Sequence, residues 1–507
     1  MTLMPRTEIA DSTVRGLVGT ARRWRKSGTR ETVRFVVAAA ICVCSDLLLP
    51  ARTGLAVASF LYLVWAIWLT KREAKGALLV LNPLVCYQAW QAVVLGLAPL
   101  YISLTDIGGD AISLGNQHVD IEWVAYGHAI MAAGSCALYV GMKQFQPKEA
   151  VSEGAPLDSA SALYLAVAVL LGSVFLIARE TITQYAGSTV AQLSYLPTAV
   201  LCMVATNQRS SQQRSAKARF WILLAGGVWL FLLNARRASK EELILSFFPL
   251  IWWLIMTKRH TLLLVGGTVL AAFYLLVIAP LVASVRTDMS FLDETGATRV
   301  ITEDGTAREL TGLEENWRSD PGDYFHTWLN QTMQRMCEPV AAGLVASLAD
   351  SGGFTFGSRL DYVPLTFIPR IFWRDKPATD LGTVFSEELG IRAPEGFKIS
   401  STGETSAGEL YWNFGWPGTL LGMYVLGAAL SGLWWRAVGT DPRRGLLEMT
   451  AYTGAMLSFV TGIGAFAGPL FIISVTAGVF WRVLIGLRWI FFKNRAISLR
   501  ARRLSAA

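Results

Sequence analysis

Charged residues are scarce in this chain of 507 residues. Asp, Glu, Lys and Arg make up 16% of it, against about 25% in an average soluble globular protein. Hydrophobic residues account for 53%, and the mean hydropathy is +0.42. A composition this apolar argues against a soluble globular chain and is typical of a polytopic membrane protein.

Histidine and cysteine are also few. The chain has four His and six Cys, and no Cys/His spacing suggests a metal site, so neither a metal nor a cofactor is expected. All the Cys except Cys337 lie inside apolar runs, which leaves no disulfide framework. The sequence contains no internal repeat, which weakens the interpretation as an inverted-repeat transporter.

Long apolar runs, by contrast, are plentiful. Most are roughly 17–23 residues long, the length of a helix that crosses a hydrocarbon core of about 30 Å. They predict an all-α polytopic fold with about twelve transmembrane helices. The predicted spans are 34–50, 54–70, 77–98, 123–142, 161–178, 190–206, 219–234, 243–257, 261–283, 417–435, 447–463 and 467–487.

The distribution of Lys and Arg orients these spans. With the N-terminus inside, the predicted inner connections are basic, whereas the outer connection 99–122 carries acidic residues and no Lys or Arg. This alternation follows the positive-inside rule. The predicted organisation is a basic cytoplasmic tail rather than a cleaved signal (1–33), transmembrane helices one to nine (34–283), a large extracytoplasmic loop with interfacial or re-entrant helices (284–416), transmembrane helices ten to twelve (417–487) and a second basic cytoplasmic tail (488–507).

The large loop 284–416 is acidic although the chain as a whole is basic. It holds 11 Lys and Arg against 20 Asp and Glu, and the rest of the chain holds 34 against 17. The sequence pI of about 9.2 therefore reflects the cytoplasmic rim, where Lys and Arg meet anionic lipid headgroups. The expected partner is the lipid bilayer, and no nucleic acid is indicated.

One short outer connection breaks the orientation rule. Arg236, Arg237 and Lys240 lie between the seventh and eighth predicted spans, in a turn too short to leave the membrane surface. Arg binds phosphate oxygens through two parallel hydrogen bonds, and Lys adds a compact charge. The turn is a candidate site for a lipid-borne diphosphate. Alternatively, Glu241 and Glu242 neutralise it within a surface network.

A second group of cations lies in the large loop. Arg359, Arg370, Arg374 and Lys376 surround a short apolar run that proline breaks at both ends. The run cannot span a membrane, but it can lie at the interface or re-enter the bilayer if protein shelters it. These cations are further candidates for diphosphate binding.

The end of the large loop combines small hydroxyl residues with aromatic ones. Trp412 and Trp416 could stack on sugar rings, and Asn413 is assigned to the same sugar site. The alternative is a Gly/Ser loop followed by an aromatic membrane anchor. Three side chains are left as candidates for the base that takes a proton from an attacking hydroxyl. They are Glu404, with Glu409 as a nearby alternative, Asp361, and His326 at the start of the predicted helix 324–349, where a structural role is the alternative.

Two of these stretches resemble bacterial O-antigen polymerases, the Wzy-type oligosaccharide repeat-unit polymerases. Residues 368–377 read IPRIFWRDKP, and 409–418 read ELYWNFGWPG; family members carry IPR–x–x–W–x–x–KP and, entering a late span, Y–x–N–F–G–x–x–G. The family's outer arginine after a mid-chain span corresponds to Arg236 or Arg237, although the usual preceding Gly-Ser is replaced by Asn234-Ala235. Arg392 and Gly403 fit a further spacing that some members share, which adds Arg392 to the diphosphate candidates.

The resemblance implies an inverting, metal-independent glycosyltransferase of the GT-C class. It would transfer a growing glycan from undecaprenyl diphosphate to the next lipid-linked repeat unit at the outer face of the bacterial inner membrane. A chain-length-determinant protein would be a possible partner. Three alternatives remain open: an O-antigen ligase with another final acceptor, a lipid-linked oligosaccharide flippase or other transporter, and a non-catalytic assembly partner.

Overall fold

A computed structural model of the chain describes residues 32–73, 83–105, 112–114, 117–145, 159–179, 181–182, 192–206, 213–235, 246–257, 266, 326, 329–330, 332–334, 336–360, 373, 385, 405–439 and 450. Most of these residues are helical. Three helices are long and apolar enough to cross a membrane, at Ala51–Thr70, Ile121–Gln144 and Lys217–Asn234. The prediction of a helical membrane-type chain is confirmed in this coarse form. The last two predicted spans lie almost entirely outside the described residues.

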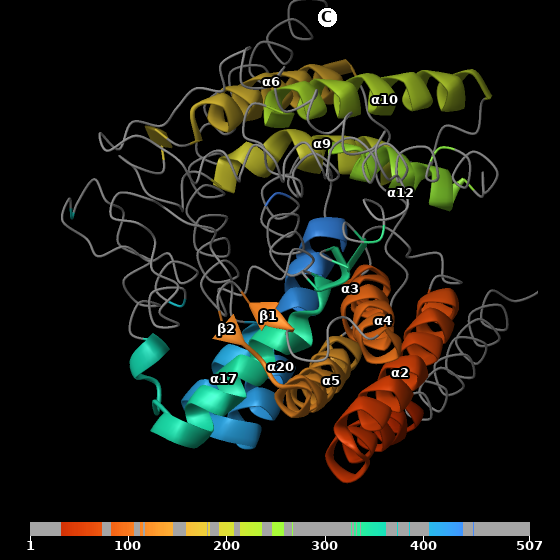
Figure 1. The fold of residues 1–507 in the computed structure, drawn as a ribbon. Helices are drawn as coiled ribbons and strands as arrows, with labels where there is room; N and C mark the ends of the chain where they lie inside the picture. Colours follow the sequence, from red (N-terminus) through yellow and green to blue (C-terminus); the bar gives the residue numbers. More distant parts are fainter. Residues whose placement is uncertain are drawn as a thin grey trace, which may run out of the picture.

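The first group of helices brings together segments from both ends of the chain (Figure 1). Its members are the helix of residues 32–48, α2 (Ala51–Glu73), α3 (Pro83–Gln91), η1 (Ala92–Leu97), α4 (Ala98–Leu104), α5 (Ile121–Gln144), α17 (Glu338–Gly352) and α20 (Ser406–Gly439). The first helix ends shortly before Pro50 and α2 begins directly after it, because proline lacks the N–H that a helix interior needs. The helices 32–48, α2 and α5 coincide with predicted spans to within a few residues.

The predicted span 77–98 needs a correction at its outer end. The helix formed by α3, η1 and α4 continues to Leu104. Its middle part, η1, has π-helical geometry, and the N–H of Ala98 bonds to Val93 O. Pro99 follows, so Leu95 O receives no N–H from the residue four positions later. This wider turn lets the helix pass the proline without ending, which the apolar pattern alone did not indicate.

A short hairpin interrupts the helical fold between α4 and α5. Strands β1 (Ser113–Leu114) and β2 (Gln117–His118) pair antiparallel, with Ser113 opposite His118. Val119 N also donates to Ile112 O at 2.8 Å. The hairpin belongs to the outer connection predicted at 99–122, which α4 shortens at its start.

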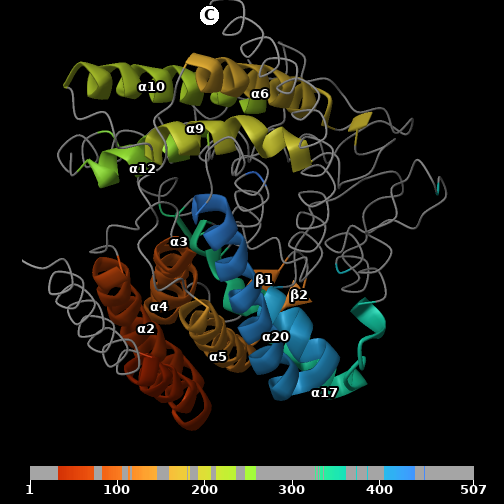
Figure 2. The same cartoon turned by 180° about the vertical axis from the view of Figure 1, so that it is seen from behind.

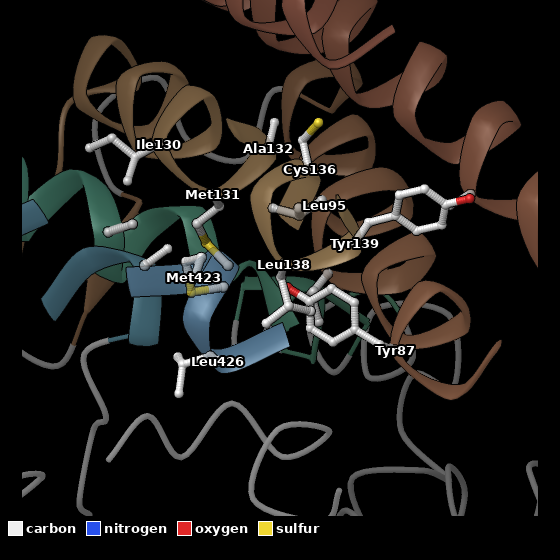
Figure 3. Close-up of a cluster of buried hydrophobic side chains, with 14 of the residues drawn as sticks. Tyr87, Leu95, Ile130, Met131, Ala132, Cys136, Leu138, Tyr139, Met423 and Leu426 are labelled. Carbon is white, nitrogen blue, oxygen red and sulfur yellow. The ribbon is translucent and has the colours of Figure 1, made fainter. Parts of the chain in front are cut away.

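Helix α5 is the centre of the first group, and glycines allow two helices to approach it closely. A Cβ on Gly127 would collide with backbone atoms of α17, and a Cβ on Gly343 of α17 would collide with Trp123 O. Farther along α5, Gly427 of α20 lies against Leu138 O in the same way. Small residues at such crossings let backbones pack closely without a side chain between them. The buried cluster around α5 is shown in Figure 3.

Helix α20 folds back on itself at a kink. Gly415 has φ 64° and ψ −155°, a conformation that is essentially restricted to glycine. Residues before and after the kink lie side by side, because Thr419 Oγ1 donates to Ala407 O at 3.3 Å and Leu410 lies against Gly422. The predicted boundary between the large loop and span ten, at 416–417, thus falls next to the kink.

A second group of helices lies across the top of Figure 1 and is seen from behind in Figure 2. It consists of α6 (Ser159–Ile177), η2 (Gln192–Tyr195), α9 (Leu196–Thr206), α10 (Gln213–Ala235) and α12 (Phe248–Met256). Trp229 Nε1 donates to Ser173 Oγ at 3.0 Å and joins α10 to α6. Asn234 Nδ2 donates to Ser246 Oγ at 3.1 Å. That bond holds together the two ends of the connection that contains the basic turn 236–240.

Candidate functional site

The described residues include six of the candidate side chains singled out in the sequence. Five of them, Arg359, Glu409, Trp412, Asn413 and Trp416, lie in α20 near its kink or against it, and the sixth is His326. The others lie outside the described residues: Glu404, Asp361, Arg236, Arg237, Lys240, Arg370, Arg374, Lys376 and Arg392.

The loop 353–360 is attached to α20 just before the kink. Thr355 N donates to Trp412 O, and Phe356 N donates to Asn413 O, each at 3.0 Å. The last carbonyls of a helix segment need such outside donors, since no following turn supplies them. The loop therefore caps the first half of α20 from more than fifty residues away in the sequence.

Backbone conformations in this loop are unusual. Phe356 has φ 49° and is the only non-glycine residue with positive φ among the described residues, and Gly357 follows with φ 91°. A positive φ on an aromatic residue costs free energy and persists only where neighbouring contacts enforce it. Here the bonds to α20 enforce it, and they leave the Phe356 side chain 80% exposed at the tip of the loop.

Arg359 lies over the indole ring of Trp412. It belongs to the short 3₁₀ helix η4 (Ser358–Leu360), and its Cζ is 3.9 Å from the ring centroid. Phe385 approaches the same indole edge to face, with ring centroids 6.1 Å apart. A guanidinium stacked on Trp is stabilised by the ring's negative face. Trp412 is 8% exposed, so its ring is largely covered by protein in this conformation.

A chain of hydroxyl and indole groups adjoins the kink on the α5 side. Trp416 Nε1 donates to Tyr126 Oη at 3.2 Å, and Tyr126 Oη lies 2.9 Å from Tyr411 Oη. Burial, and then the hydrogen bond with Tyr126, raise the pKa of the Tyr411 phenol. Tyr411 is therefore protonated at neutral pH and can donate a hydrogen bond but not act as a base.

Asn413 is fully buried, and its side-chain amide bonds to protein atoms on both ends. Oδ1 accepts from Thr355 Oγ1 at 2.9 Å and from Gly357 N at 3.1 Å. Nδ2 donates to Glu409 O at 2.9 Å. Thr355 and Gly357 were not singled out in the sequence, because nothing local signals a contact across 56–58 residues.

His326 lies away from these contacts, at the α4 side of the first helix group. Asn330 Nδ2 is 3.2 Å from His326 Nδ1, and Tyr101 Oη donates to Asn330 Oδ1 at 2.6 Å. Because the amide oxygen of Asn330 is taken by Tyr101, its nitrogen faces the imidazole, and Nδ1 is the acceptor. His326 is exposed, so its ring can be reached from solvent.

A buried acid–imidazole pair joins α5 to the helix of residues 32–48. His128 Nδ1 lies 2.7 Å from Asp46 Oδ2, and both side chains are fully buried. His128 Nε2 lies 2.9 Å from Leu95 O, the carbonyl left unpaired by Pro99. Neither residue was proposed as a site residue; an ionisable residue within an apolar run, as Asp46 is in 34–50 and His128 in 123–142, is the signal that could have identified the pair.

No group of three or more His, Cys, Asp or Glu side chains within the described residues is arranged to hold a metal ion. Comparisons with protein-family models, with curated proteins and with solved structures give no match for this chain.

Proposed function

We propose that this protein polymerises oligosaccharide repeat units carried on undecaprenyl diphosphate. The reaction would be an inverting, metal-independent glycosyl transfer at the outer face of the bacterial inner membrane, by a GT-C-type enzyme with about twelve spans and cytoplasmic termini. The observation that carries the proposal is the position of Arg359 on Trp412. This contact brings a cation of the large loop against the aromatic motif at 409–418.

The chemistry requires cations where the diphosphate leaving group develops charge. Fixed positive groups placed at that point stabilise the transition state without reorganisation. Arg359 would supply one of them, and its planar fork suits phosphate oxygens. The other proposed cations are Arg236, Arg237, Lys240, Arg370, Arg374, Lys376 and Arg392. The donor and acceptor glycans would meet at Trp412 and Trp416.

The second requirement is a base for the acceptor hydroxyl. Glu404, Asp361 and His326 remain the proposed candidates, because carboxylates and imidazoles are the side chains that most often act as general bases. Of these, His326 lies within the described residues, and its exposure leaves the ring accessible to an acceptor hydroxyl. Its role can be separated from the others by single substitutions in the assay below.

A deletion strain tests the function directly. Loss of the gene should replace a ladder of surface glycan by single repeat units, and the wild-type gene should restore the ladder. Complete loss of attached glycan, with lipid-linked polymer retained, would indicate a ligase instead. Repeat units trapped on the cytoplasmic side would indicate a flippase.

Complementation with point variants then tests the site. Arg359→Ala should fail to restore the ladder while reaching the membrane in normal amounts. Lys217→Ala is the matched control, since it removes an exposed cation from α10 in the second helix group. A full ladder with Arg359→Ala would remove Arg359 from the proposed diphosphate site.

A further inference from the structure

The kink in α20 and the loop 353–360 form a single structural unit. Because the helix is interrupted at Gly415, the backbone carbonyls of the preceding turn lack N–H donors from the next turn. Thr355 N donates to Trp412 O and Phe356 N donates to Asn413 O in their place. Within the loop, Ser358 N donates to Thr355 O at 3.1 Å and Leu360 N donates to Gly357 O at 2.9 Å. The turn that carries Arg359 is thereby connected, bond by bond, to the end of the helix segment.

The Asn413 side chain is the centre of that connection. Both acceptor positions of its amide oxygen are occupied, by Thr355 Oγ1 and Gly357 N, and its nitrogen donates to Glu409 O one turn earlier. An amide oxygen has two lone pairs, so Oδ1 has no further acceptor capacity. The side chain is also 0% exposed, which leaves no path for a sugar hydroxyl to reach it.

We propose that Asn413 is a positioning residue for Arg359 and does not bind sugar directly. It fixes Gly357 and Thr355, which fix η4, and η4 holds the guanidinium 3.9 Å above the Trp412 ring. This inference rests on the proposed function, in which Arg359 binds the donor diphosphate. Its structural part, the dependence of Arg359 on Asn413, can be tested without any assay of polymer.

Placement matters because a stacked guanidinium presents its donors in one plane. The Trp412 ring covers one face of the Arg359 guanidinium, with Cζ 3.9 Å from the ring centroid, so the ring limits the directions from which an anion can reach it. Small errors in the position of such a group are costly for a reaction that depends on fixed charges. Loss of the Asn413 contacts would release η4 and let Arg359 leave the ring.

Arginine-selective labelling with phenylglyoxal, quantified by mass spectrometry of the Arg359 peptide, measures that release in the purified full-length protein. Asn413→Ala should raise the labelling rate of Arg359, and Thr355→Val should raise it by up to about tenfold, the effect of one lost buried hydrogen bond on an opening equilibrium. Thr355→Ser keeps the hydroxyl and should restore slow labelling. Ser173→Ala, which removes a buried hydroxyl from α6, is the control and should leave Arg359 unchanged.

Unchanged labelling in Thr355→Val and in a folded Asn413→Ala variant would overturn the positioning role. Thr355→Val keeps the proposal testable if Asn413→Ala does not fold, since it removes one bond and little volume. The link to function is tested by comparing polymer with labelling. Asn413→Ala and Thr355→Val should reduce polymer in the same order in which they raise Arg359 labelling, and Thr355→Ser should retain both polymer and slow labelling, because all three act through the position of Arg359.

A loss of polymer in Asn413→Ala with Arg359 labelling as slow as in the wild type would show that Asn413 acts by another route. The proposed function fails in a different way. If the deletion strain retains its glycan ladder while Arg359 labelling still rises in Thr355→Val, the positioning contact stands and the polymerase proposal falls.

Discussion

His128 in α5 lies 2.7 Å from Asp46 in the helix of residues 32–48, and both side chains are fully buried. Leu95 O is 2.9 Å from the other ring nitrogen of His128 and can only accept a hydrogen bond. Nε2 therefore carries a proton, and one more hydrogen lies between Nδ1 and the carboxyl group. The pair is neutral overall, and it links three helices at the carbonyl that Pro99 leaves unpaired.

Removing one member of this pair should destabilise the protein strongly. In Asp46→Leu, a charged imidazole would lose its counter-charge, or a neutral one would keep its Nε2–H bond to Leu95 O and leave Nδ1 without a hydrogen-bond donor. Breaking a buried pair in this way costs about 3–5 kcal/mol. Unfolding in detergent, followed by circular dichroism or by a thermal-stability assay, measures the loss.

The double variant Asp46→Leu/His128→Leu provides the control. An apolar pair leaves no buried charge behind, and replacing a buried ion pair by apolar side chains is often close to neutral. The double variant should be more stable than the sum of the single losses predicts. Strictly additive losses would mean that the two side chains do not stabilise each other.

A second prediction concerns the contact between α17 and α5. Gly343→Ala places a methyl group against Trp123 O, a backbone atom that cannot rotate away. Overpacking of this kind costs about 1–3 kcal/mol. The matched control is Gly432→Ala in α20, where the added Cβ meets nothing within 4 Å.

The control substitution should not lower the free energy of unfolding. Alanine is the better helix former by up to about 1 kcal/mol, so Gly432→Ala should be neutral or slightly stabilising in the same unfolding assay. A Gly343→Ala variant as stable as the wild type would show that α17 and α5 can separate without cost.

Much of the first helix group could be predicted from the sequence, because its signal is local. The apolar runs at 54–70 and 123–142 correspond to α2 and α5. A long apolar run with few charges predicts such a helix whichever segments the helix packs against. The extension to Leu104 was missed, because a proline inside an apolar run usually ends a helix. Here a π-helical turn and a donor from α5 compensate for it.

The beginning of α20 could not be predicted, for a related reason. Residues 406–409 are small or polar and have the composition of a loop, yet they are helical, and residues 407–409 are buried, with Ala407 against α5 and Gly408 against α17. Tertiary packing overrides local propensity there. The sequence motif singled out Trp412 and Asn413 as candidates. It could not indicate that loop 353–360 bonds to them, because hydrogen bonds between distant segments leave no periodic pattern.

Cysteine labelling offers a third prediction. Cys337, which precedes α17, is 3% exposed, and burial raises the pKa of its thiol. Because the thiolate is the reactive form, a raised pKa lowers the reactive fraction at neutral pH. A variant that retains only Cys337 should react slowly with a water-soluble maleimide in the native state and quickly after unfolding in SDS.

Ser358→Cys in an otherwise cysteine-free chain is the control for that experiment, because residue 358 is exposed on the loop beside α20. It should react quickly in the native state. Fast native labelling of Cys337 would contradict the packing of the first turn of α17.

The last prediction separates the charge of Arg359 from its shape. Lysine keeps the positive charge but cannot stack flat on an indole or form two parallel hydrogen bonds to a phosphate group. If the stacked geometry over Trp412 is what the proposed reaction uses, Arg359→Lys should lose most of the polymer, nearly as much as Arg359→Ala.

Substitutions of the ring test the same contact from the other side. Trp412→Phe retains a smaller aromatic face and should lose less polymer than Trp412→Ala. Glycan ladders from complemented deletion strains, normalised to the amount of protein in the membrane, measure all four variants. A full ladder with Arg359→Lys would mean that a point charge suffices at this position, and the role of the Trp412 ring would then be to fill space beside the kink.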